Sequence, residues 1–254
     1  MPLNILAAPA AVPAAPRQNL DSVRSEIDRI DDQILELMAR RMAHARAIAA
    51  LKNDSDDALL LRPNREQEVI DRLADRAADR AADMPREAVS AIWRELMAVS
   101  LQTQRRTEIV LHAAQQPIPV TNAARQRFGC AAPIIVAGAP QEALDRARSR
   151  SAIAVVELHP LSNWWTELYH DSSLVILDAL EGNHGGITAL AIGRLDEACL
   201  APGRRYLILS AANLAKRIAA GEAIRPIALS GELRLCILET EEALTAMPRM
   251  CVGA

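Results

Sequence analysis

An arginine interrupts the apolar seam of a long predicted helix, and its position is the first sign of chemistry in the sequence. Apolar residues recur every seven positions in two rows: Leu20, Ile27, Ile34 and Ile48, and Val23, Ile30, Leu37 and Leu51. Arg41 falls in the first row and His44 in the second. Because an unpaired buried guanidinium is costly, either the seam opens to solvent at Arg41 or an anion meets it there.

Two further predicted helices carry polar residues on faces that should be apolar. Glu66 lies one turn before the apolar positions of the second helix, and Ser100 and Gln104 share one row of the third. Lys52 ends the long helix near its seam, and Arg65 adjoins Glu66. Together these residues predict a polar pocket inside a helical bundle, rich in cations and hydrogen-bond donors.

Purely structural interpretations exist for several of these residues. Arg41 could extend to solvent or pair with Glu66, and Ser100 could donate to a backbone carbonyl. Gln104 lies near a helix end, and His44 is more typical of an interior histidine than of a ligand. The sequence pairs no nucleophile with a base and has no metal-binding spacing such as HExxH, so we expect no metal and no organic cofactor.

Hydrophobic periodicity divides the chain into two parts of different class. Helical spacing predicts one helix over 20–51 with Asp21 as its N-cap, a second from about 64 and a third to about 106. Short β-branched runs then alternate with helical stretches. The expected divisions are a flexible Ala/Pro-rich tail over 1–19, an all-α three-helix domain over 20–106, and an α/β domain over 107–254.

Composition limits the function classes. The chain has 254 residues, a net charge of −3 and 24% charged residues, so it lacks the basic field that drives binding to nucleic acid or to an anionic membrane. It also lacks an apolar run of about 18 residues that could span a bilayer. Four scattered cysteines without a CxxC pair favour neither a disulfide framework nor a zinc site, and we expect a cytoplasmic protein.

Three stretches of the helical part resemble the all-helical (type II) chorismate mutases: "LDSVRSEIDRIDDQILELMARRMAHARAIAALK", "RPNREQEV" and "IWRELMAVSLQTQ". The resemblance covers roughly 20–106. The residues that fall where this family's substrate-binding residues lie are Arg24, Arg41, Lys52, Arg65, Glu66, Ser100 and Gln104. One position departs from the pattern, because Arg62 stands where some members carry a carboxylate.

The resemblance implies the rearrangement of chorismate to prephenate, a pericyclic step of phenylalanine and tyrosine biosynthesis that forms no covalent enzyme intermediate. It implies that Arg41 binds a carboxylate of chorismate in a bidentate fork. It further implies that Glu66 accepts a hydrogen bond from the ring hydroxyl, and that Ser100 and Arg65 hold the ring and its carboxylate. The pocket would thereby impose the folded, reactive conformer.

The resemblance also assigns Lys52 and Gln104 to the ether oxygen, where charge develops as the bond breaks. Arg24 and Lys52 are 28 residues apart, which is roughly 42 Å along one straight helix, and Arg24 and Arg41 are roughly 25 Å apart by the same rise. They cannot contact one small substrate within a single chain. We therefore expect a homodimer with antiparallel long helices, in which Arg24 serves the site of the partner.

The α/β part resembles the dehydratase domain of fused chorismate mutase and prephenate dehydratase enzymes, which has a periplasmic-binding-protein-like fold. The stretch "PGRRYLILS" is placed like that family's Thr-Arg-Phe strand, but Arg204 replaces the threonine. The glycine-rich segment of the family is missing from "LHAAQQPIPV". We expect a divergent domain that has lost the dehydratase chemistry and that binds a ligand or supports the dimer.

Three alternatives stay open on the sequence. They are a true bifunctional chorismate mutase and prephenate dehydratase, a helical lyase that releases pyruvate from isochorismate, and a non-catalytic helical dimer that binds a metabolite. Arg41 and Ser100 on the seams argue against a purely structural dimer, since apolar residues would pack better there. The polar seam does not separate catalysis from binding alone.

Overall fold

The computed structural model describes residues 19–51, 59–79, 84–149, 151–182 and 185–239. Residues 1–18 of the predicted tail and the predicted site residue Lys52 lie outside these ranges. The chain separates into two units, 1–43 and 44–254, and each is described by itself. The predicted order, helices first and an α/β part after them, is confirmed.

Helix α1 (Leu20–Leu51) is a single unbroken helix of 32 residues. It is capped by Asn19, whose side-chain Oδ1 accepts a hydrogen bond from the backbone N–H of Ser22 at 2.7 Å. The prediction of Asp21 as N-cap is therefore wrong. Asp21 lies in the first turn instead, where its carboxylate faces the positive end of the helix dipole.

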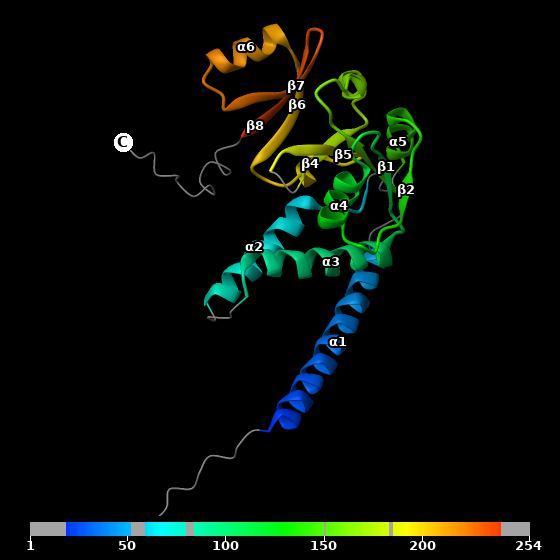
Figure 1. The fold of residues 1–254 in the computed structure, drawn as a ribbon, viewed down its shortest axis with the longest axis vertical. Helices are drawn as coiled ribbons and strands as arrows, with labels where there is room; N and C mark the ends of the chain where they lie inside the picture. Colours follow the sequence, from blue (N-terminus) through cyan, green and yellow to red (C-terminus); the bar gives the residue numbers. More distant parts are fainter. Residues whose placement is uncertain (1–18, 52–58, 80–83, 150, 183–184, 240–254) are drawn as a thin grey trace, which may run out of the picture. The chain divides into compact units, whose positions relative to one another are not determined.

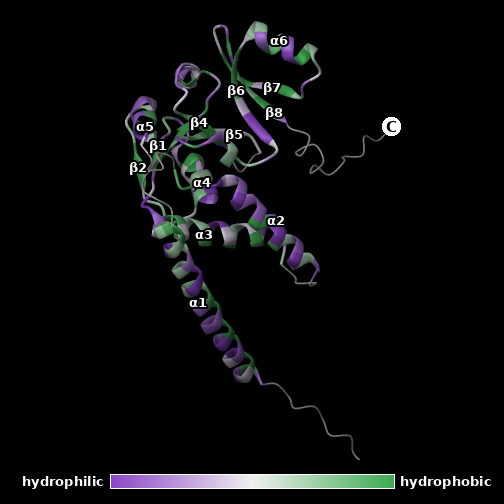
Figure 2. Ribbon diagram, turned by 180° about the vertical axis from the view of Figure 1, so that it is seen from behind, coloured by the Kyte–Doolittle hydropathy of each residue, from purple (hydrophilic) through white to green (hydrophobic). Residues whose placement is uncertain are grey.

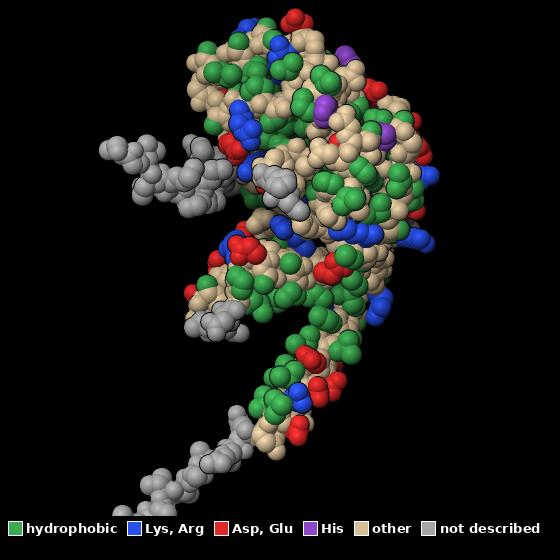
Figure 3. Space-filling view, in the orientation of Figure 1, with side chains coloured by type: hydrophobic (Ala, Val, Ile, Leu, Met, Phe, Trp, Pro, Cys, Tyr) green, Lys and Arg blue, Asp and Glu red, His purple; other side chains and the backbone are tan. Residues whose placement is uncertain are grey.

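The apolar seam of α1 is exposed in the single chain. The six apolar side chains of its two rows between Leu20 and Leu37 are each 40–64% exposed. Figure 3 shows hydrophobic side chains gathered along one side of α1, with acidic side chains on another. The ribbon in Figure 2 likewise shows hydrophobic and hydrophilic residues on different sides of this helix. An isolated helix gains little from such a stripe, because most helical stability in proteins comes from burying the apolar face.

Helices α2 (Pro63–Asp79) and α3 (Arg86–Gln104) pack against each other (Figure 1). Val89, Ala98 and Ser100 are the buried residues of α3. The helix ends at Gln104, and β1 (Glu108–His112) begins four residues later, where the hydrophobic period was predicted to change. Gln102 bridges this junction, because its side-chain amide bonds both the N–H and the C=O of Thr107.

A five-stranded mixed sheet forms the centre of the α/β part. Its strands are β1, β2 (Ile134–Val136), β3 (Ala152–Glu157), β4 (Val175–Glu181) and β5 (Ile187–Gly193), in the order β2-β1-β3-β5-β4. Strand β1 is parallel to β2 and β3, while β5 is antiparallel to β3 and β4. All six residues of β3 are buried, as expected for a central strand covered on both faces.

Helices α4 (Pro117–Phe128) and α5 (Pro140–Ala147) cover opposite faces of this sheet (Figure 1). Alternate residues of β3 belong to two different apolar clusters, Ala152 and Ala154 with α5, and Ile153 and Val155 with α4. Since successive side chains of a strand point to opposite faces, the two helices lie on the two sides of the sheet.

A second, antiparallel sheet follows, which the sequence did not predict in full. Strands β6 (Arg204–Ser210), β7 (Ile224–Ser230) and β8 (Leu233–Glu239) pair in the order β6-β8-β7, and α6 (Ala211–Ala219) connects β6 to β7. Two short 3₁₀ helices, η1 (Trp164–Tyr169) and η2 (Glu197–Cys199), precede this sheet in the chain. The stretch "NWWTELY", one of the helical stretches between the β-branched runs, thus forms a 3₁₀ helix.

The segment before α2 is part of the core of the α/β part. Leu59 and Leu61 are 0% and 3% exposed and join the cluster formed by α4 and the sheet. The N–H of Leu59 also donates to the backbone oxygen of Arg194 at 2.9 Å. Because helices and sheet share this core, the domain boundary between 106 and 107 stays a prediction. None of the described helices is both long and apolar enough to cross a bilayer.

Candidate functional site

Arg24 and Arg41 both lie on α1 within the first unit, 17 residues apart. The unbroken helix separates them by about 25 Å at its rise per residue. Arg24 is exposed, and its Nη1 lies 3.8 Å from a carboxylate oxygen of Asp21. Arg41 is half-buried, and this burial lowers the pKa of its guanidinium. An anion bound beside Arg41 would counteract this desolvation.

Ser100 and Gln104 lie one turn apart on the same face of α3, as their spacing predicted. The hydroxyl of Ser100 is buried and donates to the backbone oxygen of Leu96 at 2.7 Å. On the sequence alone, such a bond to a backbone carbonyl was a purely structural alternative for Ser100. Gln104 is the last residue of the helix and is half-buried.

The residues at the start of α2 point in different directions. Arg65 is exposed, and its Nη1 lies 2.8 Å from Oε2 of Glu68 one turn along the helix. Arg62, at the departure from the family pattern, donates through Nη1 to the backbone oxygens of Leu59 and Leu61. Arg62 therefore fixes the chain that leads into α2, a role for which a carboxylate would be unsuitable.

Glu66 is bound by the α/β part of the chain. Its Oε2 accepts a hydrogen bond from Nη1 of Arg127, near the end of α4, at 3.0 Å. Nε of the same guanidinium donates to Oδ2 of Asp178 on β4 at 2.8 Å. Arg94 of α3 lines the same small cavity as Glu66 and Arg127, and it interacts electrostatically with both carboxylates.

The charges of this cluster compensate one another. Burial by itself would lower the pKa of Arg127, whose side chain is 12% exposed, but the carboxylates of Glu66 and Asp178 outweigh it and raise the pKa. Burial, followed by repulsion from Arg127, lowers the pKa of Arg94. Two guanidinium groups thus face two carboxylates, which is the arrangement that makes buried ions tolerable.

Glu66 is consequently grouped with a different face of α3 from the one that the sequence suggested. The α3 residues around the Glu66 cavity include Arg94 and Ala98, whereas Ser100 lies two residues beyond Ala98. At about 100° per residue, Ser100 and Ala98 lie on nearly opposite sides of the helix. The sequence did not predict a role for Arg127, because an arginine in "RQRFG" is typical of the exposed surface of a helix.

A cleft of about 1220 Å³ opens between β4 and β6. It is lined by Asp178 and by Arg204 and Tyr206 of the strand that resembles Thr-Arg-Phe. Arg204 lies 3.3 Å from a carboxylate oxygen of Glu181 and 3.6 Å from one of Glu239. Burial, and then the charge of Asp178, raises the pKa of Tyr206 to about 12.

In the part of the chain that the structure describes, no three His, Cys, Asp or Glu side chains lie together in a way that could hold a metal ion. The described side chains offer other chemistry: Arg41 can bind an anion, Gln104 can donate hydrogen bonds, and Arg127 orients the carboxylate of Glu66.

Comparison with known proteins agrees with the resemblance seen in the residues. Residues 23–105 match the family described as chorismate mutase type II. A curated relative from Aquifex aeolicus (strain VF5) is 29% identical over 93 residues, which are 36% of this chain and 25% of the relative. One from Neisseria gonorrhoeae (strain ATCC 700825 / FA 1090) is 34% identical over 109 residues, 43% of this chain and 28% of the relative.

Both relatives are named bifunctional chorismate mutase/prephenate dehydratase. The aligned part spans about a quarter of the length of each relative. No solved structure matches the chain significantly. The predicted family resemblance is confirmed for the helical region: residues 23–105 carry the sequence pattern of chorismate mutase type II.

Proposed function

We propose that the protein is a chorismate mutase, an isomerase that converts chorismate to prephenate in aromatic amino acid biosynthesis. The observation that carries the proposal is the family match of residues 23–105, which includes the positions of Arg41, Ser100 and Gln104. Their environment supports it, since a half-buried guanidinium and a half-buried amide are suited to a small dicarboxylate.

In the proposed mechanism the protein orients the substrate and stabilises charge. Arg41 binds a carboxylate of chorismate, which favours the folded conformer in which the new carbon–carbon bond forms. Gln104, together with Lys52, donates to the ether oxygen as that bond breaks. The family pattern assigns Glu66 to the ring hydroxyl and Arg65 and Ser100 to the ring carboxylate. The proposal therefore requires Glu66 to reach the substrate from a different side of α3 than Ser100 does. No residue becomes covalently attached, and no metal or organic cofactor takes part.

The proposal includes a homodimer that shares its sites. Arg24 and Arg41 are about 25 Å apart on one helix, so Arg24 would serve the substrate bound by the partner's long helix. The exposed seam of α1 supports this arrangement, because a second copy of the helix would bury both of its apolar rows. A cytoplasmic location, expected from the scattered cysteines, stays a prediction.

One assay tests the function and its alternatives together. Purified full-length protein, treated with a chelator, is incubated with chorismate and separately with isochorismate, and the products are identified by chromatography and mass spectrometry. We expect prephenate from chorismate at an undiminished rate after chelation. Release of pyruvate from isochorismate without prephenate formation would identify a lyase, and binding of chorismate without turnover would identify a metabolite-binding dimer.

The same assay covers the second activity named for the relatives. We expect no conversion of prephenate to phenylpyruvate, because Arg204 replaces the family's threonine and its guanidinium is occupied by Glu181 and Glu239. Phenylpyruvate formation by the full chain would show that the α/β part is an active dehydratase.

A further inference from the structure

The carboxylate proposed to bind the substrate hydroxyl is held by a residue from outside the helical region. Glu66 belongs to α2, but its hydrogen-bond donor Arg127 belongs to α4, 61 residues further along the chain. Helix α4 packs against α3 and covers one face of the large sheet (Figure 1). The α/β part therefore sets the position of a side chain in the proposed mutase site.

The contact engages one half of the Glu66 carboxylate. Arg127 bonds Oε2, and no other described residue hydrogen-bonds this carboxylate. The Glu66 side chain is 19% exposed, so it is not sealed inside the cluster. Oε1 consequently keeps its capacity to accept a hydrogen bond from a ligand.

Arg127 is itself fixed from the sheet. Its Nε donates to Asp178 on β4, so the planar guanidinium is held at two points and cannot turn freely about its stem. Phe128 adds a third constraint, because its ring lies 5.0 Å from the guanidinium carbon of Arg127. The direction in which Arg127 presents its N–H group to Glu66 is thus determined by β4 and α4.

We propose that Arg127 is a positioning residue of the mutase site, which holds Oε2 of Glu66 so that Oε1 accepts the hydrogen bond of the substrate's ring hydroxyl. This inference rests on the proposed function. It assigns the α/β part a direct role in substrate recognition, in addition to any ligand or dimer role of its own.

The kinetic signature follows from the chemistry of the ring hydroxyl. This group neither forms nor breaks a bond in the rearrangement, so its hydrogen bond with Glu66 has a similar strength in the ground and transition states. Loss of such uniform binding raises KM and leaves kcat nearly unchanged. A purely structural defect would instead lower the fraction of active protein, and with it the apparent kcat, at constant KM.

The test compares Arg127→Met with wild type in the full-length protein. We expect KM for chorismate to rise about tenfold, as for the loss of one hydrogen bond to a charged group, with kcat within about threefold of wild type. Arg127→Lys, which keeps the charge but loses the fork, should recover part of the KM change. Glu66→Gln alone should raise KM similarly, and adding Arg127→Met to it should change KM by less than about twofold.

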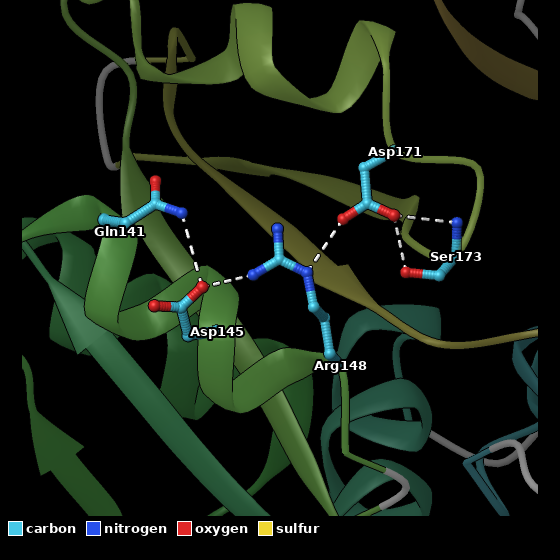
Figure 4. A network of polar contacts seen from close by, with 5 residues as sticks. All are labelled: Gln141, Asp145, Arg148, Asp171 and Ser173. Carbon is cyan, nitrogen blue, oxygen red and sulfur yellow. Dashed lines mark hydrogen bonds and ion pairs between the residues drawn. The ribbon is translucent and has the colours of Figure 1, made fainter.

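Arg148 provides a matched control. It also links two carboxylates, since its Nε lies 2.9 Å from Oδ2 of Asp171 and its Nη1 bonds Asp145, and this network lies within the α/β part (Figure 4). Asp171 is in turn bound by the N–H and the hydroxyl of Ser173. Arg148→Met should leave KM unchanged, whatever its effect on stability.

The outcomes separate the two proposals. An unchanged KM in folded Arg127→Met, a lowered KM, or an effect that adds fully to that of Glu66→Gln would overturn the positioning role while the mutase function stands. Wild-type protein without mutase activity would overturn both. If Arg127→Met does not fold, Asp178→Asn removes the other anchor of Arg127 and should raise KM by a smaller factor, and an unchanged KM in that variant would equally refute the inference.

Discussion

Ser100 and Gln104 share one face of α3, but they differ in the hydrogen bonds that their side chains can still make. The Ser100 hydroxyl donates its proton to Leu96, so in this arrangement its oxygen can only accept. To bind a substrate carboxylate the hydroxyl must turn away from the helix backbone. Gln104 ends the helix, where no following turn competes for its side-chain amide, and it can donate to a developing charge without such a change.

Gln104→Leu should lower kcat more than it raises KM, because the ether oxygen gains charge in the transition state. Loss of one such donor typically reduces kcat by about 10²- to 10³-fold. Steady-state kinetics with chorismate measures both constants. Gln102→Leu is the control, since Gln102 bonds Thr107 at the end of α3 and should affect stability alone. A raised KM at normal kcat would instead assign Gln104 to ground-state binding.

At the scale of elements, the contact between α3 and α4 depends on a glycine. Gly129 ends α4 with φ of 74°, a conformation that side chains other than glycine rarely adopt. A Cβ there would lie 2.6 Å from Cβ of Ala98 on α3. The next N–H, of Cys130, donates to both carboxylate oxygens of Glu95. This close approach brings Arg127, two residues earlier, within reach of Glu66.

Gly129→Ala should therefore destabilise the protein by about 3 kcal/mol, the combined effect of backbone strain and of overpacking against Ala98. Gly221→Ala separates the two causes, because Gly221 also has a positive φ, of 84°, but a Cβ there meets nothing within 4 Å. The control should lose about 1 kcal/mol. Denaturant unfolding measures both, and equal losses would show that the approach to α3 contributes nothing.

At the scale of the whole molecule, two groups of apolar residues differ in burial. The seam of α1 is exposed, whereas the described residues between α1 and α2 pack into the α/β part. The exposed seam supports a second copy as its partner. Leu59 and Leu61, between the first two helices, are buried in the core of the α/β part. We therefore expect the helical region, if separated from the α/β part, to lose packing that its own residues cannot replace.

Exchange of subunits tests the shared site. Arg24→Ala and Arg41→Ala homodimers should each be nearly inactive, because every site lacks one arginine. After mixing and refolding, about half of the dimers are heterodimers with one intact site, so activity should recover to about a quarter of wild type if the sites act independently. Mass spectrometry of the intact dimers confirms the exchange. Confirmed heterodimers without recovered activity would refute a contribution of Arg24 across the interface.

The sequence by itself determined the features that depend on near neighbours in the chain. The three helices follow from an apolar spacing near 3.6, because burial of one face repeats with the geometry of the helix. The change of pattern between Gln104 and β1 and the first six strands follow from short β-branched runs. The family pattern over 23–105 is of the same kind, since it lies in the order and spacing of its residues.

Strand β7 was not predicted, for a local reason. Pro226 interrupts β7 beside an irregularity in its pairing with β8, so its exposed and buried residues do not alternate regularly. The hydrogen-bond donor of Glu66 was not predicted, for a different reason, which is distance along the chain. Arg127 and Asp178 lie 61 and 112 residues beyond Glu66, and no periodic pattern links residues on a helix, a second helix and a strand. Only the packing of α4 between α3 and the sheet brings these charges together. There the two carboxylates compensate the two half-buried arginines, Arg94 and Arg127.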